Sequence, residues 1–175
     1  MIILLLAEAR SGSTNLGKWL HKSLPNFKLL NEPYNVNSDV KIDVTQDYII
    51  SEKYYFNESL IKELISISDI TFCLYRERIE EQIESYITAL STNNWYGVYD
   101  KIVADESLLE MQNKFLENKI KFKEFIVNNN LKSFTYEDLY YKDKINELKL
   151  FLKIESNVMF PYGEKYRKTH KQTIV

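Results

Sequence analysis

The residues best suited to chemistry lie in one short polar segment that follows the first apolar run, Ile2–Ala7. They are Arg10, Ser11, Gly12, Ser13 and Thr14. Hydroxyl and guanidinium groups donate hydrogen bonds to phosphate or sulfate oxygens. Leu16, Trp19 and Leu20 then recur at helical spacing, so this segment opens a helix, whose first amides and dipole favour an anion. The sequence therefore predicts an anion-binding loop between a buried strand and a helix.

The loop differs from the P-loop of nucleoside-triphosphate enzymes, which reads G-x-x-x-x-G-K-[ST] and places its lysine on the phosphates. Gly12 and Thr14 match that pattern, but Ser13 stands at the lysine position and Ala7 at the first glycine. Arg10 carries the positive charge instead. This difference disfavours ordinary ATP or GTP hydrolysis. A plain strand–helix turn, which needs only a glycine and a capping serine, is the simpler alternative.

A second cluster follows the apolar run Ile70–Tyr75. Arg76 stands at the end of this predicted strand, and Ser85 lies on the helix predicted over Arg78–Ser91. An arginine and a serine placed in this way could hold a second anionic group. The alternative is that Arg76 and Arg78 pair with neighbouring glutamates, as surface arginines commonly do.

The elements that must position both clusters alternate between strand and helix. The predicted strands are Ile2–Ala7, Asp47–Ser51, Ile70–Tyr75 and Lys132–Tyr136. The predicted helices are Thr14–Ser23, Glu58–Ile67, Arg78–Ser91, Glu106–Asn129 and Lys144–Leu152. This alternation predicts an α/β fold, a three-layer sandwich with a central parallel sheet of four to five strands. In such sheets ligands bind beyond the carboxyl ends of the strands, where both clusters fall.

The composition narrows the class of protein. The 175 residues are 45% hydrophobic with a net charge of −2, which indicates one domain over 1–175 and argues against general affinity for nucleic acid. The single cysteine, Cys73, lies in an apolar run and is expected to be a buried structural thiol. No run has membrane-spanning length, and the apolar start lacks the basic region of a signal peptide. We therefore expect a soluble, cytoplasmic protein.

Taken together, the two clusters resemble the sulfotransferases that use 3′-phosphoadenosine 5′-phosphosulfate (PAPS). Arg10–Thr14, followed by Leu16 and Leu20, is similar to the family's loop for the 5′-phosphosulfate. Leu74-Tyr75-Arg76, with Gln82 and Ser85, is similar to the element that holds the 3′-phosphate. Two shorter matches are Asn31-Glu32-Pro33-Tyr34 and Tyr136-Glu137-Asp138-Leu139. The matches follow the family's order, and an arginine at position 10 is typical of its carbohydrate-directed and bacterial members.

The resemblance implies a P-loop-NTPase-like topology and transfer of a sulfuryl group, without a metal, to a hydroxyl or amine of a small molecule or carbohydrate. The product nucleotide would be adenosine 3′,5′-bisphosphate. Arg10 would stabilise the leaving group, residues 11–14 would hold the 5′-phosphate, and Arg76 with Ser85 would hold the 3′-phosphate. Arg167 and Lys168 are the nearest match to the family's closing Arg-Lys-Gly segment.

The resemblance also suggests a general base near the acidic-Pro-aromatic turn. Glu32 is the first choice, with an ordinary loop carboxylate as its alternative, and His21 on the first helix is the second. Two other functions stay open at this point: a P-loop kinase-like enzyme, and a catalytically inactive nucleotide-binding module. No feature of the sequence specifies the acceptor or an oligomeric state.

Overall fold

The protein is described here by a computed structural model that covers residues 1–36, 40–54, 57–92, 106–142 and 144–160. Strands and helices alternate along these ranges. The strands are β1 (Ile2–Ala7), β2 (Lys28–Asn31), β3 (Tyr48–Lys53), β4 (Ile70–Tyr75) and β5 (Lys132–Thr135). The helices are α1 (Ser13–Ser23), α2 (Pro33–Val36), α3 (Glu58–Ile67), α4 (Ile79–Thr92), α5 (Glu106–Asn128), α6 (Tyr136–Tyr140) and α7 (Ile145–Leu152).

The strands form one parallel sheet in the order β2-β3-β1-β4-β5. β1 lies at its centre, where Ile3 pairs with Ile49 of β3 on one side and with Ile70 of β4 on the other. All six residues of β1 are buried, because helices cover both faces of the sheet. The predicted α/β class and parallel sheet are therefore confirmed, with five strands.

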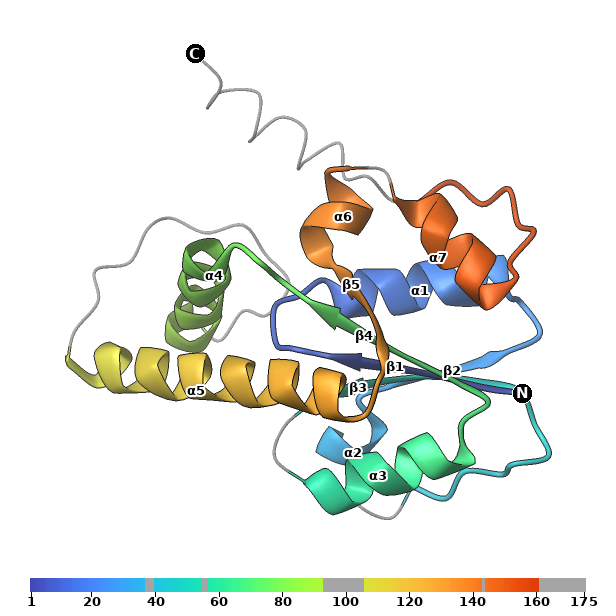
Figure 1. Cartoon of the computed structure of the whole chain (residues 1–175), viewed down its shortest axis with the longest axis horizontal. Helices are drawn as coiled ribbons and strands as arrows, with labels where there is room; N and C mark the ends of the chain where they lie inside the picture. The colour runs from blue at the N-terminus through green and yellow to red at the C-terminus, as the bar shows by residue number, and fades with distance from the viewer. Residues whose placement is uncertain (37–39, 55–56, 93–105, 143, 161–175) are drawn as a thin grey trace.

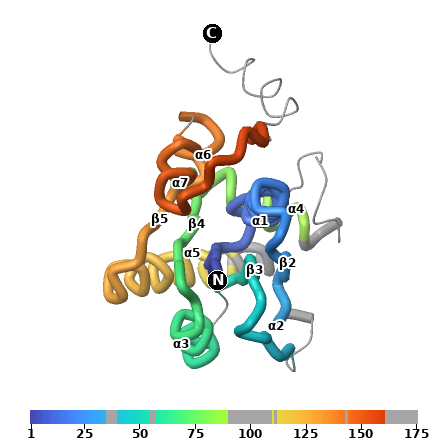
Figure 2. The backbone as a smooth tube through the Cα atoms, turned by 90° about the vertical axis from the view of Figure 1, so that its right-hand side faces the viewer, coloured from blue at the N-terminus to red at the C-terminus, as the bar shows by residue number. Residues whose placement is uncertain are grey.

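Successive side chains of β1 point to opposite faces and so divide the core in two. Ile3 and Leu5 pack in the cluster that includes α1 and α7, whereas Leu4 and Leu6 pack in the cluster that includes α3 and α5. Figure 1 shows α1, α6 and α7 on one side of the sheet and α3 with α5 on the other, and the turned view in Figure 2 shows the same layers. Helix α4 lies beyond the ends of the strands.

The four strands and five helices predicted from the sequence are all present, and strand β2 and the short helices α2 and α6 are additional. β2 was not predicted, because this edge strand has four residues and none is fully buried. β3 continues two residues past the predicted end at Ser51. β5 stops at Thr135 because the Thr135 hydroxyl accepts the Asp138 N–H at 2.9 Å, which starts α6 at Tyr136.

Two further sequence expectations concern the interior and the membrane. Cys73 is buried, as predicted, and burial raises the pKa of its thiol to about 12. Within the ranges that the structure describes, no helix combines the length and the apolar character needed to cross a bilayer.

Candidate functional site

Polar residues gather where the five strands end. Glu32 follows β2, Glu52 and Lys53 end β3, Glu8 follows β1, Arg76 follows β4, and Tyr136 with Glu137 follows β5. The chain places β2 and β3 on one side of β1 and then crosses to place β4 and β5 on the other. Such a switch point at the carboxyl ends of the central strands is the usual ligand site in open α/β sheets.

The loop after β1 is shaped by two residues with left-handed backbone, Arg10 (φ 58°) and Gly12 (φ 84°). Helix α1 begins at Ser13, and the amides of residues 15 and 16 both donate to the Gly12 carbonyl at 3.1 Å. Among the described residues, the amides of Gly12, Ser13 and Thr14 have no protein acceptor. These amides at a helix N-terminus can bind an anion, as the sequence predicts.

The loop side chains have different roles. Ser11 is fully buried and its hydroxyl donates to the Glu8 carbonyl at 2.8 Å, so it fixes the turn and leaves only its backbone for a ligand. Thr14 is half-buried in the first turn of α1. Arg10 is half-buried and points toward α4, where its Nε donates to the Ser85 hydroxyl at 2.9 Å. The structure thus brings together Arg10 of the first predicted cluster and Ser85 of the second.

Lys53 is a site residue that sequence reasoning missed. Its ammonium donates to the Ser13 hydroxyl and lies 3.5 Å from a Glu32 carboxylate oxygen, while its side chain is only 9% exposed. Burial lowers the pKa of Lys53, Glu32 opposes that shift, and repulsion from Arg10 adds to it. Ser13 stands where a P-loop has its lysine, so the neighbouring strand supplies an ammonium at that place. A lysine two residues past Ser51, the predicted end of the strand, was the available signal.

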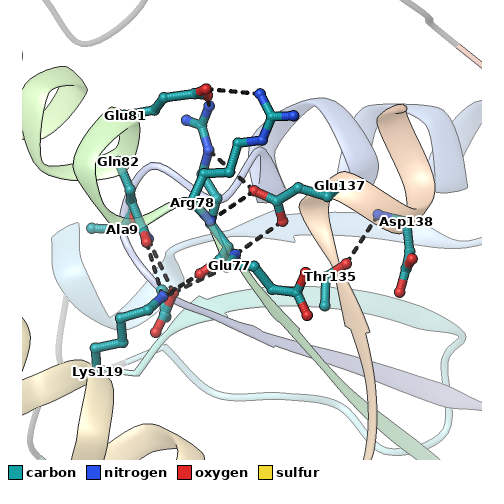
Figure 3. Close-up of polar contacts among 11 residues, drawn as sticks. Ala9, Glu77, Arg78, Glu81, Gln82, Lys119, Thr135, Glu137 and Asp138 are labelled. Atoms are coloured by element: carbon teal, nitrogen blue, oxygen red, sulfur yellow. Dashed lines mark hydrogen bonds and ion pairs between the residues drawn. The ribbon is translucent and has the colours of Figure 1, made fainter. Parts of the chain in front are cut away.

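Arg76 is held by carboxylates, which was the alternative weighed from the sequence. Its guanidinium lies 2.5 Å from Glu81 and 3.7 Å from Glu137, and it stacks over the Tyr136 ring at 4.6 Å. The Glu81 carboxylate also accepts a hydrogen bond from Arg78 at 2.9 Å (Figure 3). A phosphate that binds Arg76 must therefore replace the Glu81 carboxylate, which is 36% exposed and within reach of solvent.

Glu137 caps the helix that follows Arg76. Its carboxylate accepts the Glu77 N–H at 2.9 Å and the Arg78 N–H at 3.1 Å, immediately before α4 (Figure 3). A negative charge at this position satisfies free amides and interacts favourably with the helix dipole. The N-terminus of α4 is thus filled by the protein's own carboxylate, whereas that of α1 is open to a ligand.

Two carboxylates lie near Lys53 and could act as a base. Glu32 has a left-handed backbone (φ 51°) and a side chain that is 22% exposed beside the Lys53 ammonium. Glu52 is buried and accepts the Lys53 N–H at 2.9 Å and the Tyr34 N–H at 3.3 Å. Burial raises the pKa of Glu52, and the two N–H groups partly offset that rise.

His21, the second candidate base, lies near the far end of α1. Its ring Nδ1 is 2.9 Å from the Phe27 carbonyl, and the side chain is exposed. Eight residues separate it from Ser13, which at the helical rise corresponds to about 12 Å along the axis. The structure therefore does not bring His21 to the loop.

Two further predicted site residues, Arg167 and Lys168, lie outside the described residues. The described part of the chain contains no group of three or more His, Cys, Asp or Glu side chains arranged to hold a metal.

No protein-family model matches the sequence, and no curated protein matches it either. The function of the protein therefore has to be inferred from the geometry of the site.

Proposed function

We propose that this protein is a sulfotransferase that moves a sulfuryl group from PAPS to a hydroxyl or amine of a small molecule or carbohydrate. The observation that carries the proposal is the 2.9 Å contact between Arg10 and Ser85, which joins the loop after β1 to the helix after β4. A ligand with anionic groups at two points, as PAPS has, suits two adjoining donor sets better than a single one.

The donor set at α1 fits such a ligand. The Lys53 ammonium donates to the Ser13 hydroxyl at the N-terminus of α1, and Arg10 lies close enough for its charge to lower the pKa of Lys53. Hydroxyls of Ser13 and Ser85 already contact these cations, and the open loop amides add donors. An anion bound between the two cations would relieve their repulsion, and charge-assisted hydrogen bonds of this kind are the strong ones.

The residues can divide the work of an in-line displacement. Bound PAPS supplies the activated sulfuryl group and a stable leaving group. Arg10, Lys53 and the loop amides would stabilise negative charge that grows on the leaving side, which is the main task in transfers of this type. Glu32, next to the Lys53 ammonium, would accept the proton of the acceptor. Arg76 would hold the 3′-phosphate once Glu81 has moved away.

One observation supports the kinase-like alternative. Glu52 ends β3, the strand beside β1, where P-loop enzymes can carry an acidic residue that binds magnesium. Both of its oxygens, however, already accept backbone N–H groups, and burial raises its pKa. A carboxylate engaged in this way has less capacity left to bind Mg²⁺, so the geometry favours this alternative less.

Ligand-dependent thermal stability separates these functions. Adenosine 3′,5′-bisphosphate without magnesium should raise the melting temperature, by about 5–10 °C at 100 times the dissociation constant for a chain of this size. ATP, with or without magnesium, should not. Stabilisation by Mg-ATP alone would overturn the proposal in favour of a kinase.

Turnover is tested with the same protein. Candidate acceptors are incubated with the enzyme and PAPS, and the products are screened by mass spectrometry for the added sulfuryl group. Sulfation that depends on the enzyme supports the proposal. Tight binding of the bisphosphate with no sulfated product across hydroxyl and amine acceptors would support an inactive binding module instead.

A further inference from the structure

A buried acidic residue stands at the start of the anion loop. The Glu8 side chain is 6% exposed, and its Oε2 accepts three hydrogen bonds. The donors are the Arg76 N–H at 3.2 Å, Gln82 Nε2 at 3.0 Å and Lys119 Nζ at 2.8 Å. One carboxylate oxygen therefore connects the loop after β1 with the end of β4, with α4 and with α5.

Lys119 closes this network from the middle of α5. Its side chain is 3% exposed, and its ammonium donates to Glu8, to the Arg76 carbonyl and to Gln82 Oε1, the last at 3.0 Å. An ammonium has three donors, so all of them are used within the protein. Gln82, which is fully buried, also donates to the Ala9 carbonyl at 2.7 Å. Figure 3 shows Lys119, Gln82 and Ala9 meeting at this point.

The network is costly to bury, so its placement is informative. Burial disfavours the charged lysine and lowers the pKa of Lys119, which Glu8 opposes. Replacement of such a pair by apolar side chains is often neutral or stabilising, so stability alone is a weak reason for it. The effect of the pair is geometric, because it ties together the backbone after two strands: Ala9 after β1, through Gln82, and Arg76 after β4, directly.

We propose that Lys119 is a positioning residue that fixes the spacing between the two anion subsites, the loop with Arg10 and the strand end with Arg76. The inference rests on the proposed function, in which one ligand spans both subsites. Two linked groups bind more tightly than one only when the subsites have the spacing that the ligand requires. Loss of Lys119 therefore weakens a two-anion ligand more than a one-anion ligand.

The test compares two nucleotides on three proteins by calorimetric titration. Adenosine 3′,5′-bisphosphate carries both phosphates, and adenosine 5′-monophosphate carries one. The wild-type protein should prefer the bisphosphate by about 100-fold, as expected for linked groups that engage together. Lys119→Met should reduce this preference by about tenfold or more. Lys123→Met is the matched control, because Lys123 lies one turn further along α5 and is exposed over the Tyr75 ring at 5.1 Å; it should keep the wild-type preference.

The outcomes distinguish the two proposals. A wild-type protein that shows no preference for the bisphosphate contradicts the proposed function itself. A Lys119→Met protein with a native circular dichroism spectrum and an unchanged preference overturns the positioning role and leaves Lys119 as a structural residue. Where Lys119→Met does not fold, the same ratio is measured on the double variant Glu8→Gln/Lys119→Met. That variant removes both charges, and the amide introduced at position 8 keeps an acceptor for the Arg76 N–H. An unchanged ratio in it likewise refutes the inference.

Discussion

Replacement of Gly12 by alanine tests the shape of the anion loop directly. Gly12 has a left-handed backbone (φ 84°) at the position that precedes α1. An added Cβ would lie 2.9 Å and 3.0 Å from the Tyr136 ring and 3.3 Å from the Tyr140 ring. Those rings are stacked at 4.3 Å, and the Tyr140 hydroxyl donates to the Gly12 carbonyl at 3.2 Å, so neither ring can retreat freely.

The expected cost has two parts. A left-handed alanine is less stable than a left-handed glycine by about 1–2 kcal/mol. Overpacking against the Tyr136 ring adds about 1–3 kcal/mol. The free energy of unfolding should therefore fall by about 2–5 kcal/mol, which at roughly 2–4 °C per kcal/mol lowers the melting temperature by roughly 4–20 °C.

Gly17 provides the matched control on the same helix. A Cβ at Gly17 would meet Leu29 at 3.5 Å and Ser51 at 3.6 Å, which is ordinary van der Waals contact. Because alanine favours a helix interior, Gly17→Ala should stabilise the protein by about 0.5–1 kcal/mol. Thermal and urea unfolding followed by circular dichroism measure both variants. The two substitutions should shift stability in opposite directions.

A Gly12→Ala protein that unfolds at the wild-type temperature would refute the left-handed turn and its contact with Tyr136. The steric share can be isolated with Tyr136→Ala in both backgrounds. If the ring causes the clash, the double variant should be more stable than the sum of the single effects, by about the 1–3 kcal/mol of the overpacking part. Additive effects would leave only the backbone conformation as the cause.

Three further predictions concern single side chains. Lys53→Met should weaken bisphosphate binding by about tenfold or more, since it removes a charge-assisted hydrogen bond worth about 1.5–3 kcal/mol. Burial lowers the pKa of Lys53, and a bound anion would raise it again, so the affinity of the wild-type protein should fall as the pH rises toward the usual lysine range. This role is contradicted if the affinity does not depend on pH, or if the pH dependence persists in Lys53→Met. Glu32→Gln should bind the nucleotide normally and lose turnover. If Glu32→Gln keeps its turnover and Glu52→Gln loses it, Glu52 is the general base instead. Cys73, whose thiol pKa is about 12, should resist iodoacetamide at a pH of about 8.5 until the protein unfolds, because only the thiolate reacts; rapid labelling of the native protein would count against its burial.

The elements of the fold were predictable where apolar residues in the sequence are also the buried residues of the structure. The apolar run of β1 predicts a strand covered on both faces, and the structure buries all six of its residues. β2 was not predicted because an edge strand need not be apolar. It forms a strand through its pairing with β3 rather than through the character of its own residues. The end of β3 was missed for a related reason. Glu52 and Lys53 are polar, yet they continue the ladder because they pair with Leu6 and Ala7 of β1.

The site was predictable to the extent that it depends on local sequence and on the rule for strand ends. A glycine and hydroxyls before a helix indicate the loop, and the shared sheet edge puts Arg10 near Ser85. The partners of Arg76 were only partly predictable, because Glu81 is five residues away whereas Glu137 lies on α6, 61 residues further along the chain. The burial and the pairing of Lys119 were not predictable, because a lysine in a long polar helix ordinarily faces water and its partner Glu8 is 111 residues distant.

Under the proposed function, the charges near the loop after β1 explain how a chain of negative net charge could bind an anion. The net charge of −2 provides no long-range attraction, so affinity has to come from local cations and amides. Lys119 and Arg76 each lie within 2.8 Å of a carboxylate. The Lys53 ammonium donates to the Ser13 hydroxyl at the N-terminus of α1 and lies 3.5 Å from Glu32, and Arg10 donates to the Ser85 hydroxyl. Under the proposed function, the amides of residues 12–14 would bind an anion without displacing a carboxylate, whereas a phosphate at Arg76 would gain only the difference between its own contact and that of the Glu81 carboxylate. We therefore expect the loop to supply most of the affinity for the proposed nucleotide, and Arg76 to supply the selectivity for its 3′-phosphate.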